Sequence, residues 1–265
     1  LIDIVNNAIA NKKMRNSSFC FKQFVIFQDK CAMKVGTDGI LLGAWANISD
    51  NSQILDIGTG TGLLALMMAQ RSPSSNIDAV EIDDDAYSQA KENIENSPWG
   101  DRINIFHAPI QDFASNCSKQ YDLIISNPPF FEKASKSSQK SRNLARHSDS
   151  LSQTDILQIA SQLLKPNGHL AVIYPTDLAD TFLNKAKGFH LFCDRKVNVK
   201  PTPKTIIKRI LLELSSTLSS TQGQTQETIL IVEERKHIYT KEYINLVQDF
   251  YLNLSVVITP RPLNN

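Results

Sequence analysis

The sequence predicts an α/β fold in which helices cover a mostly parallel β-sheet. Short aliphatic runs that suit buried strands alternate with longer segments of helical periodicity. A glycine-rich turn joins one such run, 53–57, directly to an apolar helix that begins at Leu63. The chain has 265 residues, of which 42% are hydrophobic, and no internal repeat or second boundary divides it. This length and composition suit one large α/β domain.

The composition argues against several classes of protein. No run approaches the ~20 apolar residues of a membrane-spanning helix, and the first residues do not resemble a secretory signal. We therefore expect a soluble, cytoplasmic protein with no membrane partner and no obligate protein partner. The net charge of +1 does not by itself indicate a nucleic-acid binder, although it leaves room for a local basic patch. No metal site or disulfide framework is expected, because no C-x-x-C pair joins the isolated cysteines, Cys20, Cys31, Cys117 and Cys193.

The chain is expected to begin with an extension, residues 1–18, ahead of a single domain over residues 19–265. Met14 stands shortly before the first patterned stretch, and the residues before it are interpreted as lying outside the fold. The stretch 19–28 is aromatic and β-branched, which predicts one or two strands.

A helix is predicted from Gly39, with Thr37 or Asp38 as its N-terminal cap. The free N–H groups at such a helix start suit a ligand carboxylate. An ordinary N-cap with no ligand is an equal alternative at this position.

The glycine turn carries Gly58, Gly60 and Gly62. Glycine permits backbone conformations that other residues avoid, and it lets a ligand approach the main chain. The dinucleotide fingerprint G-x-G-x-x-G needs a glycine where this chain has Leu63. Together with Asp56 just before it, the turn instead resembles the cofactor motif of class I S-adenosylmethionine-dependent methyltransferases. Asp56 and the three glycines are therefore candidate cofactor-binding residues.

Acidic residues follow the next two predicted strands. Glu81 lies near the end of the strand 77–83, where a β-α-β unit places a carboxylate on the ribose hydroxyls of a nucleoside, and Asp83 is the competing candidate. Asp112 follows the strand 102–107 and is placed to bond the adenine amino group of the cofactor. The alternative is that all three acids are ordinary solvated residues.

The fourth predicted strand, 121–126, runs directly into Asn127-Pro128-Pro129-Phe130. Two prolines remove two N–H donors, so the Pro128 carbonyl is left for a ligand, and the Asn127 amide supplies a second acceptor. These acceptors suit an exocyclic NH₂ on a planar ring that stacks on Phe130, a contact that contributes ~1 to 3 kcal/mol per base. Asn127, Pro128 and Phe130 are therefore the candidate catalytic residues.

A serine-rich basic segment follows this tetrapeptide and is a candidate RNA-binding region. The alternative is a solvated loop. Its cationic residues are Lys133, Lys136, Lys140, Arg142 and Arg146.

The rest of the chain predicts further strands and helices and a second basic cluster. Strands are expected over 169–174, 189–200, 206–214 and 228–233, with a final helix over 240–252. The second cluster is formed by Lys200, Lys204, Lys208 and Arg209.

The order of these motifs closely resembles the bacterial tRNA(Val) adenine N6-methyltransferases. Those enzymes modify adenine 37, the base immediately 3′ of the anticodon. The stretches that carry the resemblance are Phe21–Phe24, Asp29–Trp45, Leu55–Gly62, Asn127–Glu132, Arg142–His147 and Tyr239–Tyr243.

The resemblance implies a class I, Rossmann-like methyltransferase fold with a seven-stranded sheet, helices on both faces and a small N-terminal strand and helix extension. It implies S-adenosylmethionine as methyl donor, with S-adenosylhomocysteine as product, and a tRNA anticodon loop as acceptor. Asn127 would contact both cofactor and target base, and Thr37 would lie at the methionine end. The chain departs from the family at Phe130, where tyrosine is more frequent. Ribosomal RNA guanine N2-methyltransferases and protein glutamine N5-methyltransferases use a similar tetrapeptide and remain the alternatives.

Overall fold

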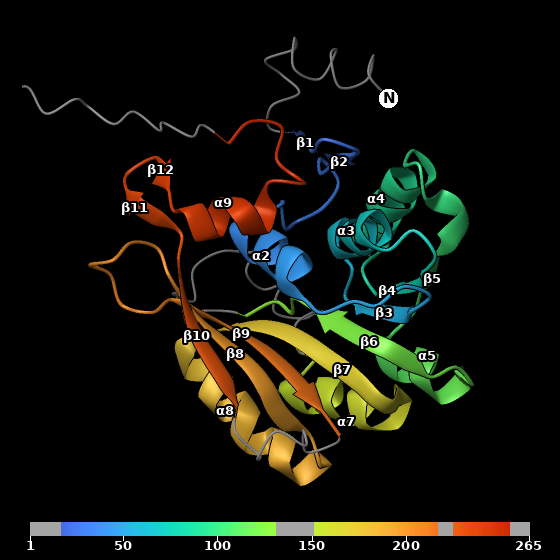
Figure 1. Cartoon of the computed structure of the whole chain (residues 1–265). Coiled ribbons are helices and arrows are strands. Elements are labelled where there is room, and N and C mark those ends of the chain that lie inside the picture. Colours follow the sequence, from blue (N-terminus) through green and yellow to red (C-terminus); the bar gives the residue numbers. More distant parts are fainter. Residues whose placement is uncertain (1–16, 131–150, 217–224, 255–265) are drawn as a thin grey trace, which may run out of the picture.

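The computed structural model describes residues 17–130, 151–216 and 225–254, and its central element is an eight-stranded sheet (Figure 1). The strand order is β10-β8-β9-β7-β6-β3-β4-β5. The strands are β3 (Gln53–Ile57), β4 (Asn76–Glu81), β5 (Ile103–His107), β6 (Tyr121–Ser126), β7 (Leu164–Pro175), β8 (Phe192–Lys200), β9 (Arg209–Ser215) and β10 (Gln226–Ile231).

Most neighbouring strands of this sheet are parallel. The exception is β9, which lies antiparallel between β7 and β8. The sheet has one strand more than the seven expected from the resemblance, because β10 pairs in parallel with β8 at the outer edge. Since β3, β4, β5, β6 and β7 are parallel, their carboxyl ends meet at one edge of the sheet, which is where α/β proteins of this kind bind ligands.

Helices cover both faces of the sheet (Figure 1). Alternate strand residues point to opposite faces, so Ile54 packs in one apolar core and Leu55 in the other. One face carries α2 (Thr37–Trp45), α3 (Leu63–Arg71), α4 (Asp84–Glu95) and α9 (Lys241–Val247), and the other carries α5 (Ile110–Asn116), α7 (Gln153–Leu163) and α8 (Thr176–Ala186). Within the described ranges, none of the helices has the length and apolar character needed to cross a membrane.

The N-terminal part of the domain is a small hairpin of β1 (Ser18–Cys20) and β2 (Val25–Phe27). Its connecting turn places Phe21 and Phe24 in a stacked pair with ring centroids 4.5 Å apart, and both side chains are buried. The proposed extension, residues 1–18, lies almost entirely outside the described residues.

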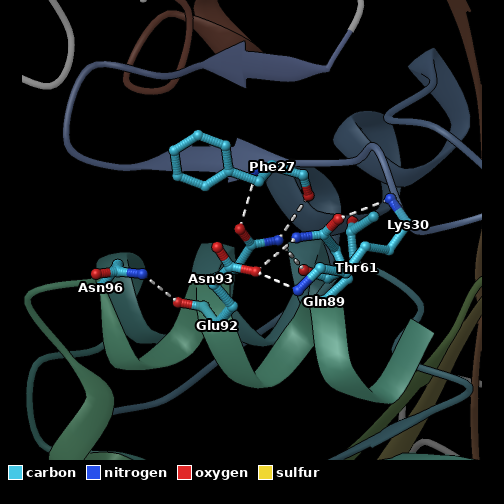
Figure 2. A network of polar contacts seen from close by, with 7 residues as sticks. All are labelled: Phe27, Lys30, Thr61, Gln89, Glu92, Asn93 and Asn96. Carbon is cyan, nitrogen blue, oxygen red and sulfur yellow. Dashed lines mark hydrogen bonds and ion pairs between the residues drawn. The ribbon is translucent and has the colours of Figure 1, made fainter. Parts of the chain in front are cut away.

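Two buried amides of α4 hold this hairpin to the glycine turn (Figure 2). The Asn93 side chain accepts from the Phe27 N–H at 2.8 Å and donates to the carbonyls of Phe27 and Thr61, each at 2.8 Å. Gln89 accepts from the Lys30 N–H at 3.0 Å. The helix α4 thereby fixes the hairpin and Thr61 of the glycine turn relative to each other.

The helix α2 begins two residues before the expected start, and the predicted cap is wrong. Its N-cap is Gly36, and no side chain caps it. Thr37 and Asp38 are instead its first two residues, and the Asp38 carboxylate faces Arg209 rather than the helix N–H groups.

Candidate active site

The glycine turn adopts the left-handed backbone conformations that its glycines permit. Gly58, Gly60 and Gly62 have φ values of +68°, +60° and +83°, in the left-handed region that only glycine enters cheaply. A Cβ at Gly60 would meet nothing within 4 Å, whereas one at Gly62 would lie 3.6 Å from Ala90. The Gly62 contact would be an ordinary van der Waals contact, so its positive φ is what favours glycine there, whereas Gly60 also leaves open space beside the main chain.

Asp56 lies beneath this turn and is fully buried. Its Oδ2 accepts from the Thr59 hydroxyl at 2.5 Å and from the Ala65 N–H at 3.1 Å, while its Oδ1 has no hydrogen-bond partner among the described residues. Burial raises the pKa of Asp56 to about 7, against the opposing effect of these two hydrogen bonds. Asp56 therefore fastens the turn to the start of α3.

Glu81 ends β4 and is oriented by backbone groups. Its Oε2 accepts from the Gly60 N–H at 2.8 Å, and its Oε1 accepts from the N–H groups of Ile82 and Asp83 at 2.8 and 3.0 Å. A carboxylate has about four acceptor positions, so Glu81 keeps about one of them, on Oε2, for a ligand hydroxyl. Asp83, the competing candidate, caps α4 by accepting from the Ala86 N–H at 2.9 Å.

A mainly apolar pocket, partly open to solvent, lies between the ends of β3, β4 and β5. It is lined by Ile57, Gly58, Val80, Ile82, Ala108, Pro109, Ile110, Gln111 and Leu151. A planar apolar ring with a few polar edges suits such a lining. Asp112 is exposed in the first turn of α5 and is not part of the lining, whereas its neighbour Gln111 is.

The segment before α2 lies beside the Glu81 carboxylate. Burial, together with the negative charges of Glu81 and Asp83, raises the pKa of Cys31 to about 11. Gln28 holds the segment in place, because its Oε1 accepts from the Val35 N–H at 2.8 Å. Thr37 follows as an exposed residue at the start of α2.

Asn127 immediately follows β6, next to the glycine turn in the sheet. The Ser126 hydroxyl donates to the Ile57 carbonyl at 2.8 Å, which links the ends of β6 and β3. The Asn127 side chain reaches α2, since a Cβ at Gly39 would lie 3.6 Å from its Nδ2. Its Oδ1 is buried and has no partner among the described residues. Buried amide oxygens are nearly always paired in proteins, so this acceptor is a candidate for a ligand donor.

Phe130 is half-buried, and Arg209 covers its ring, a contact that the sequence did not predict. The Arg209 guanidinium carbon lies 4.8 Å from the ring centroid, and its Nε donates to Asp38 Oδ2 at 2.7 Å. Arg209 begins β9 and Asp38 lies in the first turn of α2. The start of α2 and the aromatic ring after β6 are thereby joined through one arginine.

The structure thus brings together the candidate residues at the ends of β3, β4 and β6, with Pro128 buried between Asn127 and Phe130. The candidate RNA-binding residues lie outside the described residues: Lys133, Lys136, Lys140, Arg142 and Arg146.

Comparison with known proteins identifies the fold and the family. Residues 34–186, more than half of the chain, match the family model of the methyltransferase small domain. A predicted O-methyltransferase from Agrobacterium tumefaciens superposes with a TM-score of 0.62 at 18% identity, over 80% of this chain and 96% of that chain. A Listeria monocytogenes protein described as a class I S-adenosylmethionine-dependent methyltransferase gives a TM-score of 0.51 at 16% identity, over 73% of this chain and 62% of that chain.

Curated relatives are much more similar in sequence. The tRNA1(Val) (adenine(37)-N6)-methyltransferase of Trichodesmium erythraeum is 54% identical over 90% of this chain and 99% of its own length. The protein of the same name from Flavobacterium johnsoniae is 49% identical over 89% of this chain and 100% of its own length. The chain therefore belongs to the tRNA1(Val) (adenine(37)-N6)-methyltransferase family.

Proposed function

We propose that this protein transfers the methyl group of S-adenosylmethionine to the exocyclic N6 of adenine 37 in tRNA1(Val). The observation that carries the proposal is the Asn127 amide, whose buried Oδ1 lacks a partner among the described residues and stands at a strand end beside the cofactor turn. The close relatives named for this reaction support the choice of substrate.

The donor side fits a nucleoside cofactor. The apolar pocket between β3 and β5 suits the adenine ring, with Gln111 at its wall and Asp112 beside it as polar partners. Glu81 has about one acceptor position left, on Oε2, for a ribose hydroxyl, and Gly60 leaves room for close approach to the main chain. We assign the methionine end to the start of α2, near Thr37. When bound, this cofactor supplies an electrophilic methyl group on a sulfonium sulfur.

The acceptor side is assigned to Asn127, Pro128 and Phe130. Asn127 Oδ1 and the Pro128 carbonyl would each accept one N–H of the target amine, which favours the pyramidal nitrogen whose lone pair can attack. Phe130 would stack on the ring and hold it in register. No strong base is needed before the transfer, because the nitrogen proton becomes acidic as the N–C bond forms. Positioning of this kind can contribute ~7 to 11 kcal/mol to lowering the barrier.

A target base within an anticodon loop must leave its stack, at a cost of a few kcal/mol. We propose that the basic segment after Phe130 offsets part of this cost by binding phosphates. Its cationic residues are Lys133, Lys136, Lys140, Arg142 and Arg146. Because the substrate is tRNA, we expect the protein to act in the cytoplasm.

The direct test is methyl transfer from S-adenosylmethionine to unmodified tRNA1(Val), followed by digestion and mass spectrometry of the nucleosides. N6-methyladenosine at position 37 is the expected product. Parallel reactions contain ribosomal RNA and a release factor. The proposal would be overturned if tRNA gained no N6-methyladenosine while N2-methylguanosine appeared in ribosomal RNA or methylglutamine appeared in the release factor.

A further inference from the structure

The turn between β8 and β9 carries a concentration of positive charge. This β8–β9 turn, residues 201–208, is flanked by Lys200 and Arg209, and the stretch 200–209 contains no acidic residue. Lys204 and Lys208 are exposed. Among the described contacts, one ion pair involves this stretch, between Arg209 and Asp38, and Glu233 approaches it through its N–H, which donates to the Pro201 carbonyl at 2.9 Å. No described ion pair involves Lys204 or Lys208. The two lysines are therefore available to an anionic partner.

The turn has an ordered conformation. The Thr205 hydroxyl accepts from the Thr202 N–H at 3.0 Å and donates to the Thr202 carbonyl at 2.8 Å. Lys200 Nζ donates to the Pro203 carbonyl at 2.9 Å, and the Thr176 hydroxyl donates to the Ile207 carbonyl at 3.2 Å. Binding of a partner to this turn would therefore cost little conformational entropy, because the turn is already ordered.

Ile206 lies between the two exposed lysines in the sequence, and its exposed fraction is 73%. The other exposed large hydrophobic residues within the described ranges have smaller exposed fractions: Met33, Phe106 and Ile229. A single exposed isoleucine is ordinary. Its place between cations is informative, because a partner that offers phosphates to the lysines and an apolar ring face to the isoleucine would satisfy all three. Unpaired RNA nucleotides have this combination of groups.

The turn also lies at the acceptor side of the proposed active site. β9 begins at Arg209, which pairs with Pro175 at the carboxyl end of β7 and covers the Phe130 ring. The turn is therefore connected through one residue to the ring on which the target base would stack.

We propose that the β8–β9 turn is an RNA-binding surface that holds nucleotides next to the target adenine. Lys204 and Lys208 contact phosphates, and Ile206 packs on an unpaired base. This inference rests on the proposed function, since a single-stranded loop must be presented beside Phe130.

Two sets of variants test the proposal, each with a matched control. Lys204→Ala/Lys208→Ala is compared with Lys185→Ala/Lys187→Ala, a pair of exposed lysines at the end of α8. Ile206→Ser is compared with Ile229→Ser, which changes an isoleucine that is 63% exposed on the edge strand β10. Binding to unmodified tRNA1(Val) and to its anticodon stem-loop is measured between 50 and 200 mM salt, with cofactor affinity and thermal midpoint recorded for each variant.

The lysine double variant should bind RNA more weakly. The decrease of log K with log salt should become less steep, by roughly 0.7 to 0.9 for each lysine. Ile206→Ser should weaken binding roughly 3- to 10-fold without changing that slope, because it removes an apolar contact worth about 1 kcal/mol. The controls should match the wild type. Cofactor affinity should be unchanged throughout.

The inference is overturned if every turn variant binds RNA with the same affinity and salt dependence as the wild-type protein. If the wild-type protein also methylates tRNA, the proposed function remains intact. The surface would then be open to another partner, such as an acidic protein. If the wild type methylates no tRNA but the turn variants lose RNA affinity, the proposed function fails, and the inference is overturned as to a target adenine although the turn binds RNA.

Discussion

The donor and acceptor sides of the candidate site differ in how their polar groups are satisfied. On the donor side, Glu81 accepts three backbone N–H groups, and Asp56 fixes the glycine turn from below through Oδ2, while its buried Oδ1 has no described partner. On the acceptor side, Asn127 Oδ1 is buried without a described partner, and the Phe130 ring is covered by an arginine from another element.

This contrast indicates that the protein builds the cofactor site from its own backbone, whereas the acceptor site depends on groups that the substrate brings. Changes on the donor side should therefore alter cofactor affinity. Changes on the acceptor side should alter turnover and leave that affinity intact. The predictions below separate these effects, from the largest to the smallest.

Asn127→Ala should have the largest effect. Removing the amide takes away a hydrogen-bond acceptor for the target amine, so kcat should fall ~10²- to 10³-fold, as for the loss of other oriented groups that act on the reacting atoms. Cofactor affinity, measured by calorimetry, should change little. Asn96→Ala, at the exposed end of α4, is the control. A loss of cofactor affinity with unchanged kcat at saturation would assign Asn127 to the donor side.

Glu81→Gln should weaken cofactor binding and spare turnover at saturation. The change removes a charged acceptor, and hydrogen bonds to charged groups contribute about 1.5 to 3 kcal/mol, or roughly 10- to 100-fold in Kd. The matched control is Asp84→Asn, which neutralises an acid 94% exposed three residues further along. Equal cofactor affinity in Glu81→Gln and the wild type would remove Glu81 from the donor site.

Arg209→Gln should have a moderate effect, confined to the acceptor side. A partly exposed cation over an aromatic ring contributes ~0.5 to 1 kcal/mol, so kcat should fall ~2- to 5-fold with unchanged cofactor affinity. Asp38→Asn should produce part of the same loss, because Asp38 orients the guanidinium. The double variant should then lose less than the product of the two effects. Independent, multiplicative losses would show that the ion pair does not position Phe130.

Thr59→Val should change stability in a pH-dependent way. Burial raises the pKa of Asp56 to about 7 in the folded protein, from an ordinary value of 3.8. The folded state therefore binds more protons than the unfolded state between about pH 4 and 7, and this group makes the protein less stable as pH rises through that window. The Thr59 hydroxyl opposes the loss by stabilising the charged form.

Without that hydroxyl, the variant should be destabilised by about 1 kcal/mol near pH 5 and by about 2 kcal/mol near pH 8, since hydrogen bonds to charged groups are the stronger ones. Urea unfolding without cofactor at both pH values measures the difference. Thr181→Val, on the exposed face of α8, provides the control. An effect independent of pH would show that Asp56 does not titrate there.

The sequence predicted the parts of this site that depend on local pattern. The glycine turn, the acid at the end of β4 and the tetrapeptide after β6 follow from strand endings in a parallel sheet. The Arg209–Asp38 pair joins residues 171 positions apart, and no periodicity indicates such a contact. The predicted α2 cap was wrong because the helix begins at Thr37, so Thr37 and Asp38 lie within its first turn, where Asp38 pairs with Arg209. The role of the Gln89 and Asn93 amides in holding the hairpin can also be seen only in the folded structure, where the hairpin lies on α4.

The most direct test of the central claim compares two forms of tRNA1(Val) that differ only at position 37. One carries adenine and the other inosine, which lacks the N6 amine but keeps the purine ring. With S-adenosylmethionine and wild-type protein, mass spectrometry should detect one methyl group on the adenine form and none on the inosine form. Equal methylation of both would place the methyl elsewhere and contradict the assignment of the Asn127–Phe130 pocket to the adenine amine.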